Sequence, residues 1–222
     1  MNVDKSPNAI KKMFDNIATY YDSMNNIISF GTDKLIKKHC IKILNLSDKS
    51  SVLDLCTGTG DLVKIIQKLC PKAKITAVDF SKNMLDIARK QIKEVEFIEA
   101  DATNLPFEDE VFDFVTVSYG LRNIQDRAKA INEMYRVLKI GGKVLHLDFG
   151  EKNMLGKMFE VFVPYFARIL GKDYQSYKYL VNSKQTFPEP NALIKEFEDQ
   201  NFKLVERKDF LFGAISAQVF TK

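Results

Sequence analysis

Short apolar segments alternate with amphipathic ones through the middle of this 222-residue chain, and this alternation limits the possible folds more than any other feature. The apolar segments have the length of buried strands, and the amphipathic ones have helical spacing. This order is typical of parallel βαβ units in a doubly wound sheet. The predicted strands are Ser51–Leu55, Lys74–Val78, Val95–Glu99, Phe112–Val117 and Lys143–Asp148. The helices predicted between them are Asp61–Leu69, Lys82–Ile92 and Ala128–Leu138.

The two ends of the chain follow other patterns. Helical spacing predicts helices at Asn8–Asp22 and Thr32–Leu44, ahead of the first strand. Beyond Phe149 we expect three helices and two strands, and the short link between those strands permits an antiparallel pair. Together with the central segment, they predict a seven-stranded sheet. The elements expected there are Met154–Leu170, Tyr174–Lys184, Asn191–Gln200, Lys203–Asp209 and Ala214–Thr221.

Composition argues against several classes of protein. The net charge is only +4 and the basic residues are scattered, so we expect no nucleic-acid partner. Cys40, Cys56 and Cys70 form no CxxC pair, which favours reduced thiols in a cytoplasmic protein. His39 has no ligand-like spacing to other residues, and we expect no metal. The first residues lack an apolar signal core, and charges interrupt the most apolar stretch, Met154–Leu170.

A glycine loop follows the first predicted strand. Gly58 and Gly60 let a ligand approach the backbone closely, although a tight turn would also explain them. A dinucleotide site needs a third glycine, because the pyrophosphate rests on the helix N-terminus, and Val63 stands there instead. Asp61 opens the helix, where its charge would repel a phosphate. The loop therefore favours a cationic amino-acid and sulfonium ligand over a dinucleotide.

Polar residues follow the next strands at the same edge of the predicted sheet. Asp79 ends the second strand, where its carboxylate can accept from ribose hydroxyls. Asp101 lies after the third strand and could accept from an adenine amino group, although a solvated acidic loop is the alternative. Ser118 stands at the end of the fourth strand. The loops together predict one ligand-binding rim.

These stretches resemble the class I S-adenosylmethionine methyltransferases, and others narrow the resemblance to the ubiquinone/menaquinone biosynthesis C-methyltransferase family. The resemblance runs from about residue 13 to about residue 205. Tyr119 stands where Phe is usual in that family, and Asp148 where Glu is usual. The general motifs are 52–61, 77–85 and 101–107. The narrower ones are 13–25, 119–124, 133–139, 176–180 and 186–188.

The resemblance implies a Rossmann-like fold, S-adenosyl-L-methionine as cofactor, and methylation of demethylmenaquinol or the related ubiquinol precursor at a ring carbon. Within a single domain, we expect residues 1–45 to form a helical cap and 46–150 the cofactor-binding core. Residues 151–222 would supply lid helices and closing strands. The expected cofactor-binding residues are Tyr21, Asp54, Gly58, Thr59, Gly60, Asp79, Phe80, Asp101, Ala102 and Ser118.

Two residues are predicted to act on the acceptor. Arg122 could stabilise a phenolate or hold a water that takes the proton, but it cannot itself be a base. The alternative is a surface arginine that pairs with Asp126. Asn123 could orient the same water. Tyr21 and Asp22 follow an amphipathic helix and could fold over the cofactor.

The expected partner is a prenylated quinol, and the aromatic stretch Phe159–Phe166 offers a wall for its tail or simply packs on the sheet. If exposed, this stretch could bring a cytoplasmic protein against the inner face of the membrane. The sequence leaves a homodimer open. Two other functions also remain: a methyltransferase acting on another small acceptor, and a non-catalytic cofactor-binding protein. A nicotinamide-dependent dehydrogenase is the weakest alternative, because of Val63.

Overall fold

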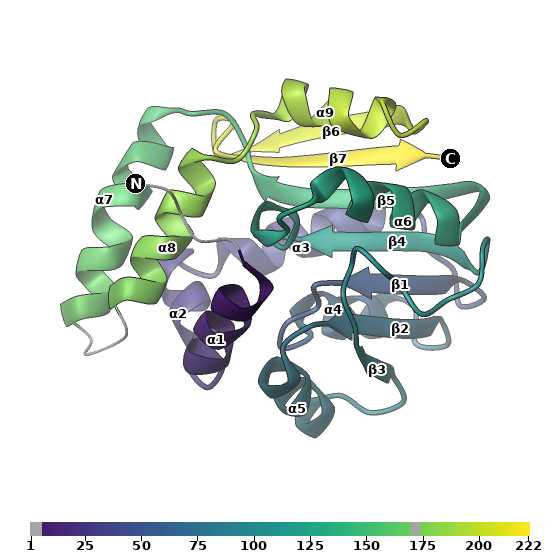
Figure 1. Ribbon diagram of the computed structural model, residues 1–222, viewed down its shortest axis with the longest axis horizontal. Helices are drawn as coiled ribbons and strands as arrows, with labels where there is room; N and C mark the ends of the chain where they lie inside the picture. Colours follow the sequence, from purple (N-terminus) through teal and green to yellow (C-terminus); the bar gives the residue numbers. More distant parts are fainter. Residues whose placement is uncertain (1–5, 170–173) are drawn as a thin grey trace.

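A seven-stranded sheet in the order β3-β2-β1-β4-β5-β7-β6 forms the centre of the molecule (Figure 1). The computed structural model describes residues 6–169 and 174–222. Strands β1 to β5 are parallel, and β7 runs antiparallel to both of its neighbours. The prediction of a doubly wound sheet with an antiparallel C-terminal pair is therefore confirmed. The strands are β1 Ser51–Leu55, β2 Lys74–Asp79, β3 Glu96–Glu99, β4 Phe112–Ser118, β5 Leu138–Phe149, β6 Lys203–Phe210 and β7 Ile215–Thr221.

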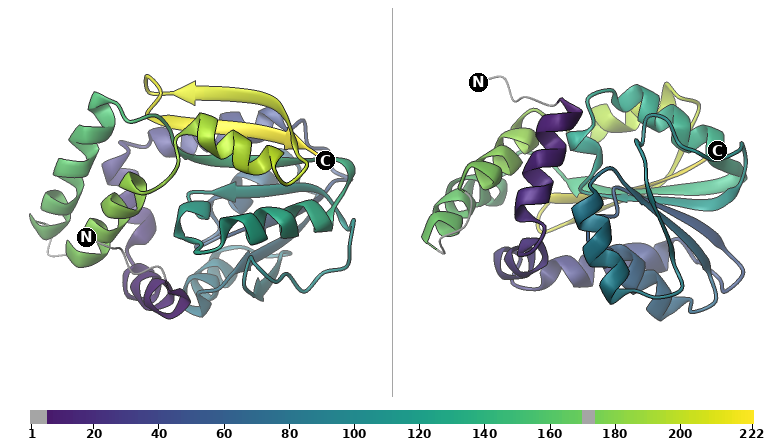
Figure 2. Two further views of the ribbon diagram at one scale, coloured as in Figure 1. Left: turned by 45° about the horizontal axis from the view of Figure 1, so that its top comes forward. Right: turned by 60° about the horizontal axis from the view of Figure 1, so that its bottom comes forward.

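Helices cover both faces of the sheet (Figure 2). Apolar residues of α3, α4 and α5 pack against one face, and those of α6 and α9 pack against the other. On the second face Phe197 and Phe220 stack with ring centroids 4.2 Å apart. Each buried side chain of this size contributes roughly 1.5–3 kcal/mol. These helices are α3 Thr32–Ile43, α4 Asp61–Leu69, α5 Lys82–Gln91, α6 Arg127–Val137 and α9 Pro190–Glu198.

Four further helices lie beyond the carboxyl ends of β1 and β4 (Figure 1). We call these four helices the cap; α3, which was expected to belong to an N-terminal cap, packs on the sheet instead. Met24 of α2 packs there against Val163 of α7 and Tyr177 of α8, so segments from before and after the central strands form one small core. Ile17 joins α1 to Met84 of α5. The cap helices are α1 Pro7–Ile17, α2 Tyr21–Ile28, α7 Met154–Ile169 and α8 Tyr174–Gln185.

The predicted single helix Asn8–Asp22 is wrong, because α1 ends at Ile17 and α2 begins at Tyr21. Tyr20 leaves the helical conformation, with φ −123° and ψ 5°. The bend lets Ile17 at the end of α1 reach Met84 of α5 while Met24 of α2 packs against α7 and α8. In the segment predicted as Met154–Leu170, Leu170 lies outside the described residues. None of the described helices combines the length and apolar character that a membrane crossing requires.

Candidate functional site

A cavity of about 1420 Å³ lies between the carboxyl ends of the parallel strands and the cap. Sites for one small molecule usually occupy roughly 300–1,000 Å³, so this cavity has room for two molecules side by side. All of the predicted site residues line it except Gly60. In residues 6–169 and 174–222, no cluster of His, Cys, Asp or Glu is arranged to hold a metal ion.

The two glycines of the loop after β1 serve different purposes. Both have positive φ, +57° at Gly58 and +82° at Gly60, a conformation that favours glycine. A Cβ on Gly58 would meet nothing within 4 Å, and this backbone borders the cavity. A Cβ on Gly60 would lie 2.3 Å from Cδ1 of Ile92. Gly58 thus leaves space for a ligand, whereas Gly60 is required by the turn and by packing.

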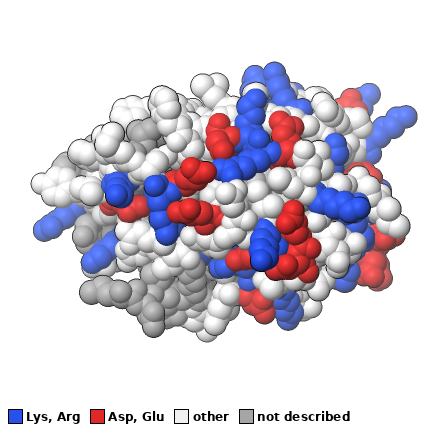
Figure 3. All heavy atoms as spheres, turned by 90° about the horizontal axis from the view of Figure 1, so that it is seen from above, with Lys and Arg blue, Asp and Glu red and all other residues white. Residues whose placement is uncertain are grey.

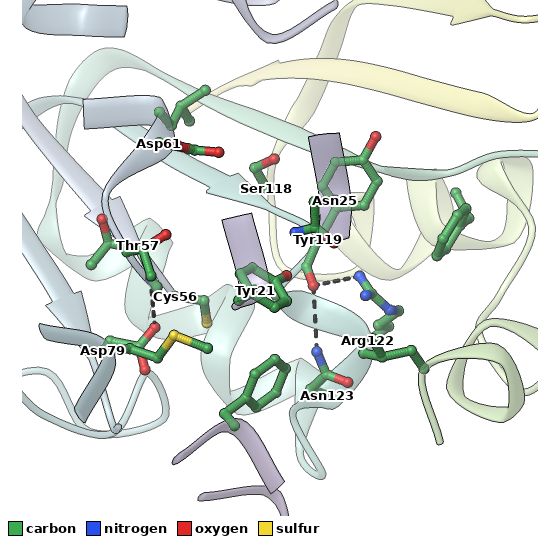
Figure 4. Close-up of a pocket in the computed structure, with 18 of the residues that line it drawn as sticks. Tyr21, Asn25, Cys56, Thr57, Asp61, Asp79, Ser118, Tyr119, Arg122 and Asn123 are labelled. Carbon is green, nitrogen blue, oxygen red and sulfur yellow. Dashed lines mark hydrogen bonds between the residues drawn. The ribbon is translucent and has the colours of Figure 1, made fainter. Parts of the chain in front are cut away.

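Asp79 ties this loop to the end of β2 (Figure 4). Its Oδ2 accepts a hydrogen bond from the Gly58 N–H at 2.8 Å, and its Oδ1 accepts one from the Ser81 N–H at 2.9 Å. Burial raises the pKa of this carboxyl to about 6 against these stabilising bonds. Each oxygen keeps a second lone pair for a ligand hydroxyl.

Three buried polar atoms beside the cavity find no hydrogen-bond partner of normal geometry among the described residues. They are Oδ2 of Asp54, Oγ1 of Thr57 and Oγ of Ser118, although the Thr57 side chain lies close enough to Asp54 to lower the pKa of that carboxyl. The other carboxylate oxygen of Asp54 accepts from Oγ1 of Thr116 at 2.6 Å, and burial raises the pKa of Asp54 to about 6. Buried polar atoms in proteins nearly always have partners, so this floor of the cavity fits a polar ligand that carries positive charge.

Side chains of the cap reach down to the loops that follow β2 and β3. Nζ of Lys11 on α1 lies 2.5 Å from Oε1 of Glu99, at the end of β3. One turn further along α1, Oδ1 of Asp15 accepts from Oγ of Ser81 at 2.6 Å. These contacts hold α1 over the loops that the sequence assigns to cofactor binding.

The start of α2 covers the glycine loop in the same way. The hydroxyl of Thr59 donates to Oδ1 of Asp22. Tyr21 lines the cavity (Figure 4), and its ring meets Phe14 edge-on at 6.1 Å. The two residues that the sequence suggested as a cover therefore lie over the glycine loop and beside the cavity.

Lys37 of α3 is a cavity residue that the sequence analysis missed. Its ammonium lies 2.6 Å from Oδ2 of Asp33 and 3.8 Å from Oδ2 of Asp61. Burial by itself would lower the pKa of Lys37, but the two carboxylates outweigh burial and the pKa is raised. The Asp33–Lys37 spacing of one helical turn was the only visible signal, and it is also common on exposed helices.

Arg122 is buried, with 4% of its surface exposed, and lies in the 3-10 turn η1 Leu121–Asn123 after β4. Its Nη1 donates to both oxygens of Asp148, at 3.1 and 3.3 Å, and to the carbonyl of Tyr119 (Figure 4). The guanidinium also lies 5.1 Å from the ring centre of Phe149. The alternative of a surface pair with Asp126 is wrong, because Asp126 instead caps α6 by accepting from the Lys129 N–H.

Asn123 lies where the strand ends meet the cap. Its Nδ2 donates to the Tyr119 carbonyl at 3.4 Å, and its Oδ1 accepts from the Tyr179 hydroxyl of α8 at 3.4 Å. Gly120 lets the chain pass close to the loop after β1, because a Cβ on it would lie 2.3 Å from Cβ of Cys56. Arg122 and Asn123 thus line the cavity beside one backbone carbonyl.

The remaining predicted residues contribute to the cavity's edge. Asp101 is exposed and accepts from the N–H of Thr103 at 2.8 Å, so it forms a short turn as well as lining the cavity. Ala102 and Phe80 add apolar wall beside it. In the stretch Phe159–Phe166, the side chains of both end residues lie outside the described part of the structure.

The family model described as the ubiE/COQ5 methyltransferase family matches residues 1–222. Among curated proteins, a demethylmenaquinone methyltransferase of Bacillus cytotoxicus is 34% identical over 96% of this chain and 95% of its own.

Two solved structures illustrate the likeness in fold. An S-adenosylmethionine-dependent methyltransferase of Thermotoga maritima has a TM-score of 0.73 at 21% identity and covers 96% of this chain and 99% of its own. A protein of Bacillus halodurans named as a methyltransferase has a TM-score of 0.60 at 28% identity, over 78% of this chain and 71% of its own. These likenesses confirm the Rossmann-like methyltransferase fold.

Proposed function

Because this chain belongs to the ubiE/COQ5 methyltransferase family, we propose that it methylates a ring carbon of a prenylated quinol, as in the conversion of demethylmenaquinol to menaquinol. S-adenosyl-L-methionine is the cofactor, and when bound it supplies an electrophilic methyl group on a sulfonium. The name of the Bacillus cytotoxicus relative supports the demethylmenaquinol choice. A different small acceptor has no such support, and the buried polar floor of the cavity argues against a scaffold.

We assign the cofactor to the polar floor of the cavity. Asp79 would accept from the ribose hydroxyls, and the turn at Asp101 and Ala102 would border the adenine. Asp54 would balance the positive charge of the ligand, which the raised pKa of this buried carboxyl supports. Lys37, fixed by its two aspartates, would hold the amino-acid carboxylate.

The acceptor would lie between that floor and the apolar side chains of α7 and α8. Ring-carbon attack needs a phenolate, and a phenol with a pKa near 10 loses its proton at pH 7 at a cost of about 4 kcal/mol. The Arg122 guanidinium stays protonated and would stabilise the phenolate oxygen, while Asp148 and the Tyr119 carbonyl hold it in place. A water held by Arg122 and Asn123 would take the phenol proton. As the carbon–carbon bond forms, the carbon–sulfur bond breaks and S-adenosylhomocysteine leaves. The methylated ring carbon then loses its own proton to water and the quinol oxygen is protonated again, which restores the aromatic ring.

One observation carries the proposal: the buried Arg122, held by Asp148 and the Tyr119 carbonyl, lines the same cavity as the buried polar atoms of the floor. Preorganised donors of this kind typically contribute 10²–10³ to turnover. We also propose that residues 1–222 act as one domain, since both the cap and the sheet line the cavity. A prenylated acceptor resides in a bilayer, so we propose peripheral contact with that membrane.

The test measures S-adenosylhomocysteine and methylated quinol by mass spectrometry, with demethylmenaquinol as acceptor and simple phenols and amines as comparison. Removing Arg122 alone would leave the buried Asp148 carboxylate without its ion-pair partner and would destabilise the fold. The informative variants are therefore Arg122→Lys, which keeps the charge, and the double variant Arg122→Met/Asp148→Asn.

Both variants should lose turnover by about 10²-fold or more while S-adenosylhomocysteine affinity stays within about threefold. Arg89→Lys is the control, since Arg89 bonds Asp86 and the Phe97 carbonyl and none of these residues lines the cavity. Unchanged turnover in Arg122→Lys and in the double variant would remove Arg122 from the mechanism. Methylation of the comparison phenols, with none of the quinol, would replace the proposed acceptor.

A further inference from the structure

Large apolar side chains are exposed around the opening of the cavity. Phe30 and Phe212 are 93% and 94% exposed, a costly arrangement for a surface that meets only water. All but Phe212 of the following set also line the cavity, so its apolar wall continues onto the outer surface. We call this set the mouth surface: Ile27, Phe30, Met158, Phe162, Leu211 and Phe212.

The mouth surface belongs to three segments: residues 27–30, α7 and the β6–β7 turn. Two side-chain contacts hold this end of the molecule together. Nδ2 of Asn153, at the start of α7, donates to the Phe212 carbonyl in the β6–β7 turn at 2.9 Å. On the other side, the rings of His39 on α3 and Phe210 on β6 meet at 5.7 Å. The exposed apolar residues therefore belong to one end of the molecule, beside the opening.

Exposed basic residues accompany this end. Lys34 follows Phe30 in the first turn of α3, Lys157 precedes Met158, and Arg168 lies in the last turn of α7. The exposed Glu151 nearby is paired with Arg207 at 2.8 Å. Seen from above, most of the described atoms at the end that carries α7 are white, with several basic residues at its edge, whereas red and blue mix more densely over the rest (Figure 3).

We infer that the mouth surface docks on an anionic lipid bilayer, with its apolar side chains in the interfacial region and the basic residues against acidic headgroups. A second copy of this chain or another protein in that place would cover the opening through which an acceptor must enter. A bilayer instead delivers the acceptor through it. This step rests on the proposed function, because it takes the acceptor to be held in lipid.

The experiment measures co-sedimentation with phosphatidylcholine vesicles that contain or lack phosphatidylglycerol. The test variant is Val161→Ser/Phe212→Ser. Phe212 belongs to the mouth surface, and Val161 is 71% exposed on α7, about one helical turn from Met158. Neither side chain lines the cavity. Ile140→Ser is the control: Ile140 is 80% exposed, beside the pairing of Gly141 with the C-terminal Lys222. The C-terminus beside Ile140 lies at the end of the sheet opposite to α7 and α8 (Figure 1).

The wild type and Ile140→Ser should bind the anionic vesicles equally, more weakly at high salt, and better than neutral vesicles. The double variant should bind at least about tenfold more weakly, equivalent to about 1.4 kcal/mol. Equal binding by all three proteins would overturn the inference. Absence of vesicle binding by the wild type would also overturn the inference. If light scattering then shows a wild-type dimer that the double variant does not form, the surface binds a second copy of the chain instead.

A second readout separates this inference from the proposed function. In the absence of vesicles, the double variant and the wild type should methylate a short-tailed, water-dispersed quinol at the same rate. Weaker vesicle binding with that rate intact supports docking. If no quinol is methylated by the wild type, the proposed function fails, while the vesicle comparison still decides whether this surface binds lipid.

Discussion

The buried carboxyl of Asp54 should make the protein without cofactor less stable at neutral pH, and Asp54→Asn should relieve this cost. Asn can keep the hydrogen bond from Thr116 through its own oxygen, and its amide takes the place of an oxygen that has no partner of normal geometry among the described residues. The substitution therefore removes a charge while changing little else at the end of β1.

The size of the effect follows from the pKa of Asp54, which burial raises from 3.8 to about 6. Below pH 3.8 the carboxyl is protonated in both folded and unfolded chains, so its burial costs no charge. Between pH 3.8 and about pH 6 the folded state holds more protons than the unfolded state, so the free energy of unfolding falls as the pH rises. The raised pKa of Asp54 lowers the free energy of unfolding by about 1 kcal/mol near pH 4.5 and by about 3 kcal/mol above pH 7, because each pKa unit corresponds to about 1.36 kcal/mol.

Urea unfolding of the unliganded protein near pH 4.5 and near pH 7.5 measures this difference. Any fixed cost of the amide cancels in the comparison, so the gain of Asp54→Asn over wild type should grow by about 2 kcal/mol between the two conditions. Asp113→Asn is the control. Burial would raise the pKa of Asp113, but bonds from Lys139 and Ser51 outweigh it and the pKa is lowered below 3.8. Both test conditions lie above that window, so any loss of stability in Asp113→Asn should be nearly the same at the two pH values. A gain for Asp54→Asn that does not change with pH would refute the reasoning.

Three further changes probe other parts of the site. Lys37→Met should weaken S-adenosylhomocysteine binding by about tenfold or more in calorimetry, because a fixed cation is lost; unchanged affinity would exclude Lys37 as the carboxylate partner. Asp15→Ala should speed S-adenosylhomocysteine release in stopped-flow measurements by breaking the bond to Ser81, and an unaltered rate would mean that α1 does not retain the ligand. Gly60→Ala should lower the free energy of unfolding by about 1–3 kcal/mol in urea, because of its φ of +82° and Ile92; a smaller loss would show that the turn adapts.

The sheet and its ligand-binding edge could be predicted because their signals are local. Each strand is a short apolar run, and parallel strands bring all their carboxyl ends to one edge. Asp79 and Ser118, at two such ends, therefore reach the same cavity without any knowledge of tertiary contacts. The absence of a third glycine at Val63 was informative for the same reason, since it concerns a single turn.

Contacts between distant segments could not be predicted in this way. Arg122 and Asp148 meet because the end of β4 runs beside β5, in a register that pairs Ser118 with Leu147. Nothing in the spacing of these residues distinguishes that pair from the local alternative with Asp126. The break between α1 and α2 could not be predicted for a related reason. The helical pattern continues through Tyr20, and the bend reflects the packing of α1 on α5 and of α2 on α7 and α8.

The Arg122–Asp148 pair is better explained by chemistry than by stability. Two buried opposite charges lose much of their hydration, and apolar residues of similar size usually stabilise a core as well or better. Here the pair instead borders a large cavity, and the arginine is held by a carboxylate, a carbonyl and an aromatic ring at once. Such a guanidinium needs no rearrangement when negative charge appears on an acceptor beside it, which is the condition for electrostatic catalysis. The cost of burying the pair therefore favours an acceptor that becomes anionic, and a quinol does so where an amine does not.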